Sequence, residues 1–299
     1  MADLQAPLIL VPSFVYGTAE KTDPLLILSA LRVGYRALDC ACQAHFYDER
    51  AVGQAIASAL SPVSQEGLGL HRNDLFIQTK FTTPASHKPG LAPYLEDDMP
   101  EVKVRKSLDM SLTSLGIDYV DCLLLHGPMP TFEETIEIWA AMESVFGDKV
   151  HRLGVSNVSL EQLEGIYNVA TVKPSIVQNR FWPYNHFDSG ARSFCAKNNI
   201  IYQAFWVLTG NPKLLDSNFV GWSAEKMGAS REDALFSLVL SLGQDGPQVS
   251  VLNGTTNPER MFRSLEVTQR IGEVPEVVRR GFVDELDSLA KHLMNTNTA

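Results

Sequence analysis

PEVKVRKSLDMSLTSLGIDYVDCLLLHGP, residues 100–128, contains the pattern that decides the fold. Residues 100–115 have the apolar spacing of a helix, and residues 120–125 form a short, almost continuous apolar run that is typical of a buried strand. His126 follows this strand directly. A helix that leads into a short buried strand is the repeating unit of α/β proteins, in which helices cover parallel strands.

The same alternation continues along the chain in both directions. We predict eight strands, at 14–17, 37–40, 75–79, 120–125, 152–155, 176–178, 200–204 and 248–252. We predict eight helices that alternate with them, at 24–32, 48–60, 100–115, 131–146, 159–169, 187–198, 224–242 and 258–268. Capping-box spacing at Thr131 with Glu134 and at Ser159 with Gln162, and a proline at 258, support the helix starts. A further helix is expected at 276–294, before a polar tail.

Strands that alternate with helices predict parallel neighbours joined by right-handed crossovers, and eight such units close into a barrel. A doubly wound sheet is the competing architecture, but it predicts a GxGxxG turn after an early strand, and the sequence has none. The length of 299 residues is compatible with two domains of about 150 residues or with one barrel of about 250, and the alternating pattern decides for the barrel. We therefore expect an α/β fold, a single (β/α)8 TIM barrel with an additional C-terminal helix, in which residues 1–299 form one domain.

The charge balance excludes whole classes of partner. Thirty-five acidic residues against 25 basic ones leave a formal charge of -10, which has the wrong sign for a protein that binds nucleic acid or an anionic membrane over a wide surface. The sequence has no apolar run of about 18 residues. Its first ten residues, MADLQAPLIL, contain an aspartate, where a signal peptide has basic residues. We therefore expect a cytoplasmic protein with no membrane or nucleic-acid partner.

The cysteines predict neither a disulfide framework nor a metal centre. Cys40, Cys42, Cys122 and Cys195 lie in apolar stretches, which is typical of reduced, buried thiols. Cys40 and Cys42 with His45 lack a second pair that would complete a ligand set, so we expect no metal.

In a barrel, the reacting groups gather where strands end and the following loops begin. The polar residues at these positions are Asp39, Tyr47, Lys80, His126, Ser156, Asn157 and Gln178. An adjacent ammonium stabilises a phenolate, so Lys80 is expected to lower the pKa of Tyr47, and Asp39 is expected to keep Lys80 charged. His126 is able to hydrogen-bond a carbonyl oxygen beside the tyrosine. This set suits proton delivery to a carbonyl group that receives a hydride.

Each of these residues alone is also compatible with a structural role. An Asp and a Lys at strand ends often form a structural ion pair, and a His after an apolar strand is often a hydrogen-bonded core residue. Their coincidence on successive strands of one barrel favours a shared chemical function.

Six stretches resemble the aldo-keto reductase superfamily, in order and at matching spacing, within residues 12–267. They are GYRALDCA (34–41), HFYDERAVGQAI (45–56), LFIQTKF (75–81), SLGIDYVDCLLLHGP (114–128), LGVSNVSLEQL (153–163) and IVQNRFWP (176–183). The resemblance implies a (β/α)8 fold, NAD(P)H-dependent reduction of aldehydes or ketones, and a catalytic tetrad of Asp39, Tyr47, Lys80 and His126.

The position of the tetrad tyrosine departs from the superfamily pattern. Counting back from Glu49 selects Phe46, and counting forward from Asp39 selects Ala44, and neither residue is able to donate a proton. We choose Tyr47 because the chemistry requires a hydroxyl group.

The resemblance also implies a cofactor that lies extended across the barrel mouth. Ser156, Asn157 and Gln178 are expected to hold the nicotinamide carboxamide. Phe205 stands where a tyrosine usually stacks on the nicotinamide ring, although it is also compatible with core packing, and Leu208 is expected to contact the cofactor.

The phosphate-binding segment departs from the resemblance as well. Asn253, Gly254 and Thr255 replace a Pro-Lys-Ser segment whose lysine contacts the 2'-phosphate of NADPH in many members. Thr255, Arg260 and Arg263 are the remaining candidates for this phosphate, unless both arginines are merely solvated. We expect NADPH, with NADH as the alternative.

The substrate is expected to be a small carbonyl compound, bulky or aromatic. Ala19 replaces a common tryptophan, while Trp182, Trp206 and the loop FTTPASHKPGLAPYLEDD (81–98) remain available as walls, unless the tryptophans are ordinary core residues. We expect an oxidoreductase, a monomer or weak dimer, in which nicotinamide supplies the hydride and Tyr47 the proton. The alternatives are a cofactor-binding regulatory barrel, like the channel β subunits of the superfamily, and a metal hydrolase, which needs a histidine cluster that the sequence lacks.

Overall fold

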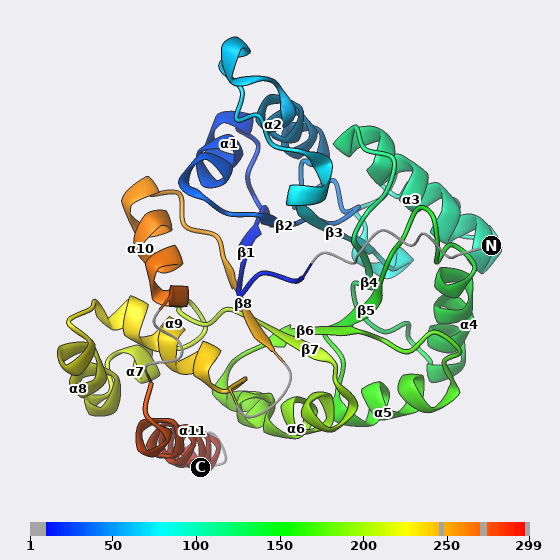
Figure 1. The fold of residues 1–299 in the computed structure, drawn as a ribbon. Coiled ribbons are helices and arrows are strands. Elements are labelled where there is room, and N and C mark those ends of the chain that lie inside the picture. Colours follow the sequence, from blue (N-terminus) through cyan, green and yellow to red (C-terminus); the bar gives the residue numbers. More distant parts are fainter. Residues whose placement is uncertain (1–9, 245–247, 270–273, 297–299) are drawn as a thin grey trace, which may run out of the picture. The chain divides into compact units, whose positions relative to one another are not determined.

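Eight parallel strands form a closed barrel in the order β1 to β8 in a computed structural model that describes residues 10–244, 248–269 and 274–296 (Figure 1). The strands are β1 Phe14–Gly17, β2 Ala37–Asp39, β3 Phe76–Phe81, β4 Cys122–Leu125, β5 Leu153–Ser156, β6 Ile176–Arg180, β7 Ile201–Phe205 and β8 Val249–Asn253. The predicted (β/α)8 barrel is therefore confirmed, and each predicted strand overlaps an observed one. The end of the predicted polar tail, residues 297–299, lies outside the described residues.

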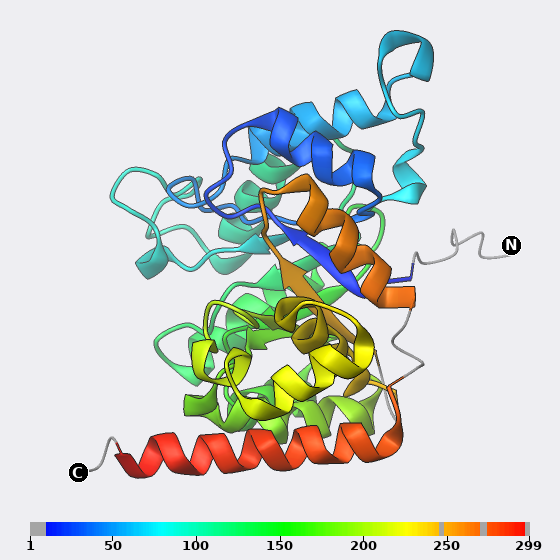
Figure 2. The same ribbon diagram turned by 90° about the vertical axis from the view of Figure 1, so that its left-hand side faces the viewer.

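The helices follow the strands as expected, with short additional turns. They are α1 Pro24–Val33, α2 Glu49–Leu60, α3 Pro100–Leu115, α4 Phe132–Glu143, α5 Leu160–Val169, α6 Ser189–Asn198, α7 Pro212–Leu215, α8 Asn218–Met227, α9 Arg231–Ser241, α10 Pro258–Gln269 and α11 Glu276–Thr296. Four 3-10 helices occur as well, η1 Val63–Gln65, η2 Arg72–Asp74, η3 Pro84–Ser86 and η4 Pro183–Asp188. The predicted C-terminal helix is α11, which is a single long helix (Figure 2).

Side-chain caps begin several of these helices. The Thr131 hydroxyl accepts a hydrogen bond from the Glu134 amide at 3.2 Å, and the Glu134 carboxylate accepts one from the Thr131 amide at 3.0 Å. Ser159 and Gln162 form the same reciprocal arrangement at the start of α5. Both predicted capping boxes are therefore present.

The predicted helix at 224–242 is wrong because two helices occupy this region. Gly228 ends α8 at a φ of 60°. Glycine adopts this left-handed conformation at little cost because it has no Cβ. Ser230 then begins α9, where its hydroxyl accepts a hydrogen bond from the Asp233 amide at 3.1 Å. Apolar spacing continues across the break, since both helices bury residues, and so it does not reveal the turn.

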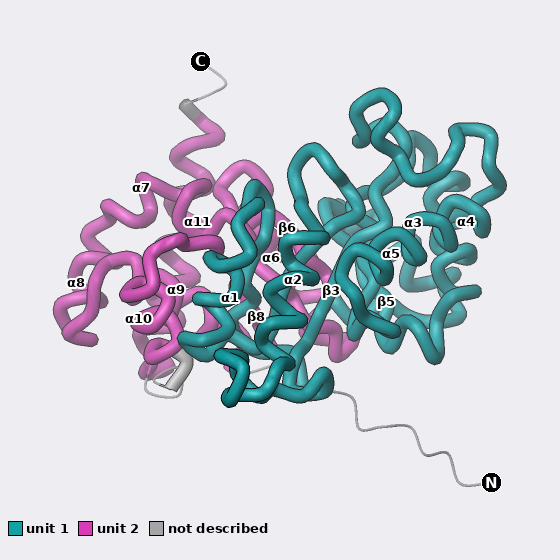
Figure 3. Tube along the Cα trace, turned by 90° about the horizontal axis from the view of Figure 1, so that it is seen from above, with its two compact units in different colours: residues 1–176 teal, residues 177–299 magenta. Residues whose placement is uncertain are grey.

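The chain comprises two compact units, and each is described by itself (Figure 3). Unit 1, residues 1–176, contains β1 to β5 and α1 to α5. Its strand register pairs Asp39 with Gln78 and Lys80 with Leu124, so the carboxyl ends of β2, β3 and β4 meet at one edge. This register brings the polar residues at the strand ends together.

Unit 2, residues 177–299, contains β7 and β8 and the helices from α6 onward. β7 pairs with β8, with Tyr202 opposite Val249. The buried Phe282 of α11 stacks on Phe219 of α8, with ring centroids 6.2 Å apart, which fixes α11 within this unit. That residues 1–299 form one domain stays a prediction.

The described residues also bear on the cysteines, on membrane spans and on metal sites. All four cysteines are buried and free, as predicted. No helix among the described residues combines the length and apolar character that a membrane crossing requires. Within the same ranges, no group of three or more His, Cys, Asp or Glu side chains is arranged to hold a metal ion.

Candidate active site

The four predicted tetrad residues lie together in unit 1. Asp39 is the last residue of β2, Lys80 lies in β3, His126 follows β4, and Tyr47 lies in the loop between β2 and α2. The parallel register of the strands places the first three at the same edge of the sheet.

Lys80 and Asp39 form a buried ion pair. The Lys80 Nζ lies 2.8 Å from Oδ1 and 2.7 Å from Oδ2 of Asp39, and 2.8 Å from the Cys40 carbonyl oxygen. The side chains of Lys80 and Asp39 are only 1% and 2% exposed. Burial lowers the pKa of Lys80, but Asp39 and Tyr47 outweigh it and raise this pKa above its ordinary value. Lys80 is therefore a cation at neutral pH.

Tyr47 lies beside both Lys80 and His126. The Lys80 Nζ is 5.0 Å from the centroid of the Tyr47 ring, and the Tyr47 ring meets the His126 ring edge to face at 6.1 Å. Burial raises the pKa of Tyr47, whereas Lys80 lowers it, and the net direction is upward. Lys80 thus lowers the pKa of Tyr47 as expected, but the net pKa is raised, because desolvation of the phenolate exceeds the attraction of the ammonium.

A tight turn determines that the ring of Tyr47, and not that of Phe46, faces the tetrad. The amides of Phe46 and Tyr47 both donate to the Gln43 carbonyl, at 2.9 and 3.0 Å, and Asp48 caps the start of α2. The Phe46 side chain is 46% exposed and packs against His45. Tyr47, not Phe46, therefore has its ring beside Lys80.

His126 is fixed by a residue that sequence reasoning missed. The Thr82 hydroxyl oxygen lies 2.9 Å from His126 Nδ1. Burial, with smaller contributions from the charges of Lys80 and His87, lowers the pKa of His126 to about 3. The imidazole is therefore neutral. No sequence signal marked Thr82 beyond its place two residues after Lys80.

The long loop after β3 is anchored beside this cluster. The Tyr94 hydroxyl donates to the Thr82 carbonyl, and the Tyr94 ring stacks on Phe81 with centroids 5.6 Å apart. Gln43 Nε2 donates to the Ser86 carbonyl at 2.8 Å, which ties the Tyr47 loop to the loop at 81–98. These contacts hold the loops that carry Tyr47 and Thr82.

Glu49 is a second residue whose role sequence reasoning missed. Its buried carboxylate accepts hydrogen bonds from the hydroxyls of Thr79 at 2.5 Å and Ser111 at 2.9 Å. Burial raises the pKa of Glu49, while the two hydroxyls and Lys80 oppose this shift. Glu49, two residues after Tyr47, thereby joins the start of α2 to β3 and α3.

In unit 1, two of the predicted cofactor residues follow one another at the end of β5. Ser156 is buried, and Asn157 has a φ of 57°. Asn157 Nδ2 donates to the His126 carbonyl at 2.8 Å and to the Ser156 hydroxyl at 3.1 Å. The buried Oδ1 of Asn157 has no hydrogen-bond partner among the described residues. A carboxamide N–H of a nicotinamide would satisfy this acceptor, so the residues fit that group.

In unit 2, the other predicted nicotinamide residues lie at strand ends. Gln178 of β6 donates through Nε2 to Gln203 Oε1 at 3.0 Å. Phe205 ends β7 and is partly exposed, and Leu208, also partly exposed, lies in the turn that follows. A partly exposed aromatic residue at a strand end fits the stacking role expected of Phe205.

The loop between β8 and α10 is organised by Asn253. Asn253 Nδ2 donates to the Ser264 hydroxyl at 2.9 Å, and its Oδ1 accepts from the Thr255 amide at 3.0 Å. Asn257 then caps α10 by accepting from the Arg260 amide at 3.0 Å, and the Arg260 side chain is exposed. Asn253 thus holds the backbone of the segment in which the expected lysine is missing.

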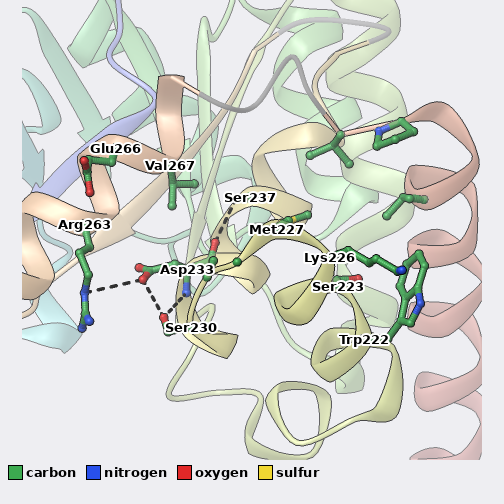
Figure 4. A pocket seen from close by; sticks show the side chains of 15 residues that line it. Trp222, Ser223, Lys226, Met227, Ser230, Asp233, Ser237, Arg263, Glu266 and Val267 are labelled. Atoms are coloured by element: carbon green, nitrogen blue, oxygen red, sulfur yellow. Dashed lines mark hydrogen bonds and ion pairs between the residues drawn. The ribbon is translucent and has the colours of Figure 1, made fainter.

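Arg263 has an acidic partner of its own. Its Nε lies 3.8 Å from an Asp233 carboxylate oxygen, and the two side chains line a cavity of about 600 Å³ among α8, α9, α10 and the start of α11 (Figure 4). The charge of Arg263 is therefore partly balanced without a phosphate.

Comparisons with known proteins agree with this geometry. The model of the aldo/keto reductase family matches residues 18–221. An aldo-keto reductase of Mycolicibacterium smegmatis is 29% identical over 242 residues, which are 81% of this chain and 75% of the relative. A D/L-glyceraldehyde reductase of Hypocrea jecorina is 31% identical over 226 residues, 68% of this chain and 62% of the relative.

A solved structure agrees as well. The crystal structure of an aldo/keto reductase from Brucella melitensis superimposes with a TM-score of 0.73 at 26% identity, covering 93% of this chain and 95% of that one. The strand-end residues, the barrel and the family match lead to one conclusion: this chain belongs to the aldo/keto reductase family and is an oxidoreductase that reduces carbonyl compounds with a nicotinamide cofactor.

Proposed function

We propose that Tyr47 donates the proton to the carbonyl oxygen of the substrate. The nicotinamide, when bound, supplies a hydride to the carbonyl carbon. Burial raises the pKa of Tyr47, so its hydroxyl still carries its proton at neutral pH. The Lys80 ammonium stabilises the phenolate that remains after transfer. The observation that carries this proposal is the contact of the Tyr47 ring with both Lys80 and His126.

His126 orients the carbonyl group in this proposal. Its depressed pKa keeps the ring neutral, so it acts as a hydrogen-bond donor and not as an acid. If Nδ1 accepts from the Thr82 hydroxyl, Nε2 carries the proton and donates to the carbonyl oxygen. Asp39 keeps Lys80 charged and does not contact the substrate.

We propose NADPH as the cofactor, with NADH as the alternative. Ser156, Asn157 and Gln178 hold the carboxamide, and Phe205 stacks on the ring, with Leu208 beside it. Thr255 and Arg260 bind the 2'-phosphate at the start of α10, where amide groups and the helix dipole favour an anion. The exposed guanidinium of Arg260 supports this role more than that of Arg263, which faces Asp233.

The proposed substrate is a bulky or aromatic aldehyde or ketone. Trp182 and Trp206 meet edge to face at 5.9 Å, and Trp206 is 46% exposed, so an aromatic surface is available to a substrate in unit 2. We also propose a monomer or weak dimer, which sedimentation of the purified protein over a range of concentrations would test.

The direct test is NADPH oxidation by the purified protein with substituted benzaldehydes and acetophenones. We expect aldehyde-dependent loss of absorbance at the NADPH band, with NADPH preferred over NADH. Tight NADPH binding without turnover of any carbonyl compound would instead favour a regulatory, cofactor-binding protein.

A further inference from the structure

Arg180, the last residue of β6, lies among three aromatic rings of unit 2. Its guanidinium carbon is 4.8 Å from the centroid of the Trp206 ring, 5.7 Å from that of Trp182 and 5.8 Å from that of Phe205. Planar guanidinium groups pack favourably on aromatic faces. These rings reduce the rotational freedom of the guanidinium and hold it at the strand end.

No acid neutralises this cation within the described part of the chain. Its guanidinium takes part in no ion pair or side-chain hydrogen bond there, although the chain has ten more acidic than basic residues. Arg72 and Arg263, by contrast, each have an aspartate partner. The fork of N–H donors on Arg180 is therefore available to an anion from outside the chain.

The surrounding backbone is built to hold Trp206 in this position. Trp206 has a φ of 62°, a costly conformation for a bulky residue. The buried Asn211 stabilises it by donating through Nδ2 to the carbonyl of Trp206 at 3.1 Å and to that of Phe181 at 2.6 Å. A Cβ at Gly210 would approach the Trp206 carbonyl oxygen to 2.8 Å. Such strain persists only where the surroundings impose it, and it is concentrated at functional sites.

Arg180 also lies next to two residues of unit 2, Gln178 and Phe205, that are expected to contact the nicotinamide. Gln178 and Arg180 are two residues apart in β6, so both side chains leave the strand on the same side. Phe205, the proposed stacking residue, is one of the three rings around the guanidinium. The carboxyl ends of barrel strands are where substrates bind.

We propose that Arg180 binds a carboxylate of the carbonyl substrate, so that the preferred substrates are anionic aldehydes or ketones with a planar, aromatic body. A carboxylate pairs with two N–H groups of the guanidinium, while the body of the substrate lies against Trp182 and Trp206. This inference rests on the proposed function, because it assigns a substrate class to the reaction proposed above.

The test compares 2-, 3- and 4-carboxybenzaldehyde with their methyl esters, which have the same shape but no charge. For the wild type with NADPH, we expect kcat/KM for at least one acid to exceed that of its ester by 10-fold or more. In Arg180→Met this ratio should fall at least 10-fold, and Arg180→Lys should retain part of it. Arg105→Met, at an exposed arginine of α3, is the matched control and should keep the wild-type ratio.

The other outcomes separate the alternatives. If Arg180→Met weakens NADPH binding 10-fold, measured by tryptophan fluorescence, and leaves the acid-to-ester ratio unchanged, the arginine binds a cofactor phosphate and the inference is overturned. If the wild type reduces acids and esters equally well, the inference is overturned but the proposed function stands. If the wild type reduces none of these aldehydes, the proposed function is contradicted. In that last case, saturable binding of benzoate to the wild type with NADP⁺ and its loss in Arg180→Met still support the carboxylate site, and no binding overturns it.

Discussion

The Lys80 ammonium contacts both carboxylate oxygens of Asp39, at 2.8 and 2.7 Å, and the Cys40 carbonyl oxygen at 2.8 Å. The three N–H groups of the ammonium thus have three fixed hydrogen-bond acceptors within the barrel. This arrangement holds a positive charge beside Tyr47 and makes the charge depend on Asp39.

Asp39→Asn should therefore lower both the free energy of unfolding and the turnover. Removing one member of a buried ion pair leaves an uncompensated charge and costs about 3–5 kcal/mol. The double variant Asp39→Asn/Lys80→Met should recover part of the loss in urea unfolding, because no unpaired charge remains. Asp109→Asn is the control, since Asp109 pairs with Lys149 at an exposed site and should cost about 1 kcal/mol or less. A single Asp39→Asn variant as stable as the control contradicts the pairing.

The Thr82 hydroxyl should set the tautomer of His126. Thr82→Val removes the hydroxyl at nearly constant volume, whereas Thr82→Ser retains it. We expect Thr82→Val to lower kcat about 10-fold or more and to shift the ¹⁵N signals of His126 away from the Nε2–H form, with Thr82→Ser close to wild type. Identical ¹⁵N signals in all three proteins would show that Thr82 has no influence on the ring.

The low pKa of His126 predicts how stability depends on pH. The folded state holds this ring neutral down to a pKa of about 3, whereas the unfolded chain takes up a proton near the ordinary value of 6.5. The unfolded state therefore binds more protons between these two values, and stability falls as the pH decreases through that window, by about 1.4 kcal/mol per unit for this one group.

Replacing His126 tests this linkage. His126→Asn should reduce the slope of the unfolding free energy between pH 6.5 and 4.5 relative to wild type. His71→Asn, at an exposed histidine of the turn before β3, is the matched control and should leave the slope unchanged. An NMR titration in which His126 gains a proton near pH 6.5 in the folded protein would contradict the low pKa of this ring.

The two arginines of α10 should differ in their effect on the cofactor. Arg260→Ala should weaken NADPH binding about 10-fold and NADH binding less than 2-fold, because only NADPH has a 2'-phosphate. Arg263→Ala should weaken NADPH binding less than 3-fold, since Asp233 already faces this guanidinium. Equal losses of NADPH affinity in both variants would contradict this difference and support a phosphate site formed by both arginines, as expected from the sequence.

The barrel could be predicted from the sequence because its strands are buried on both faces and their sequences are largely apolar. All six residues of β3 and all four of β4 are buried, including Lys80. The break between α8 and α9 could not be predicted from spacing, because burial continues on either side of Gly228. Only the glycine and the following Ser230 with Asp233 marked the turn.

The site could be predicted only where chemistry restricts the residue type. Tyr47 is identifiable because Ala44 and Phe46 lack a hydroxyl, and the turn at Gln43 is what brings its ring to Lys80. Thr82 was missed because its partner, His126, lies 44 residues away, and the bond from Asn211 to the Phe181 carbonyl was missed because it spans 30 residues. Such contacts depend on tertiary structure, and no local pattern indicates them.

The measurement that tests the central claim most directly is the turnover of Tyr47→Phe. With NADPH and a benzaldehyde, we expect kcat to fall about 100- to 10,000-fold while the Kd for NADPH stays within 2-fold of wild type, because only the proton donor is lost. Phe46→Leu, the matched control at the neighbouring exposed ring, should keep wild-type turnover. Wild-type kcat in Tyr47→Phe would contradict the assignment of Tyr47 as the acid.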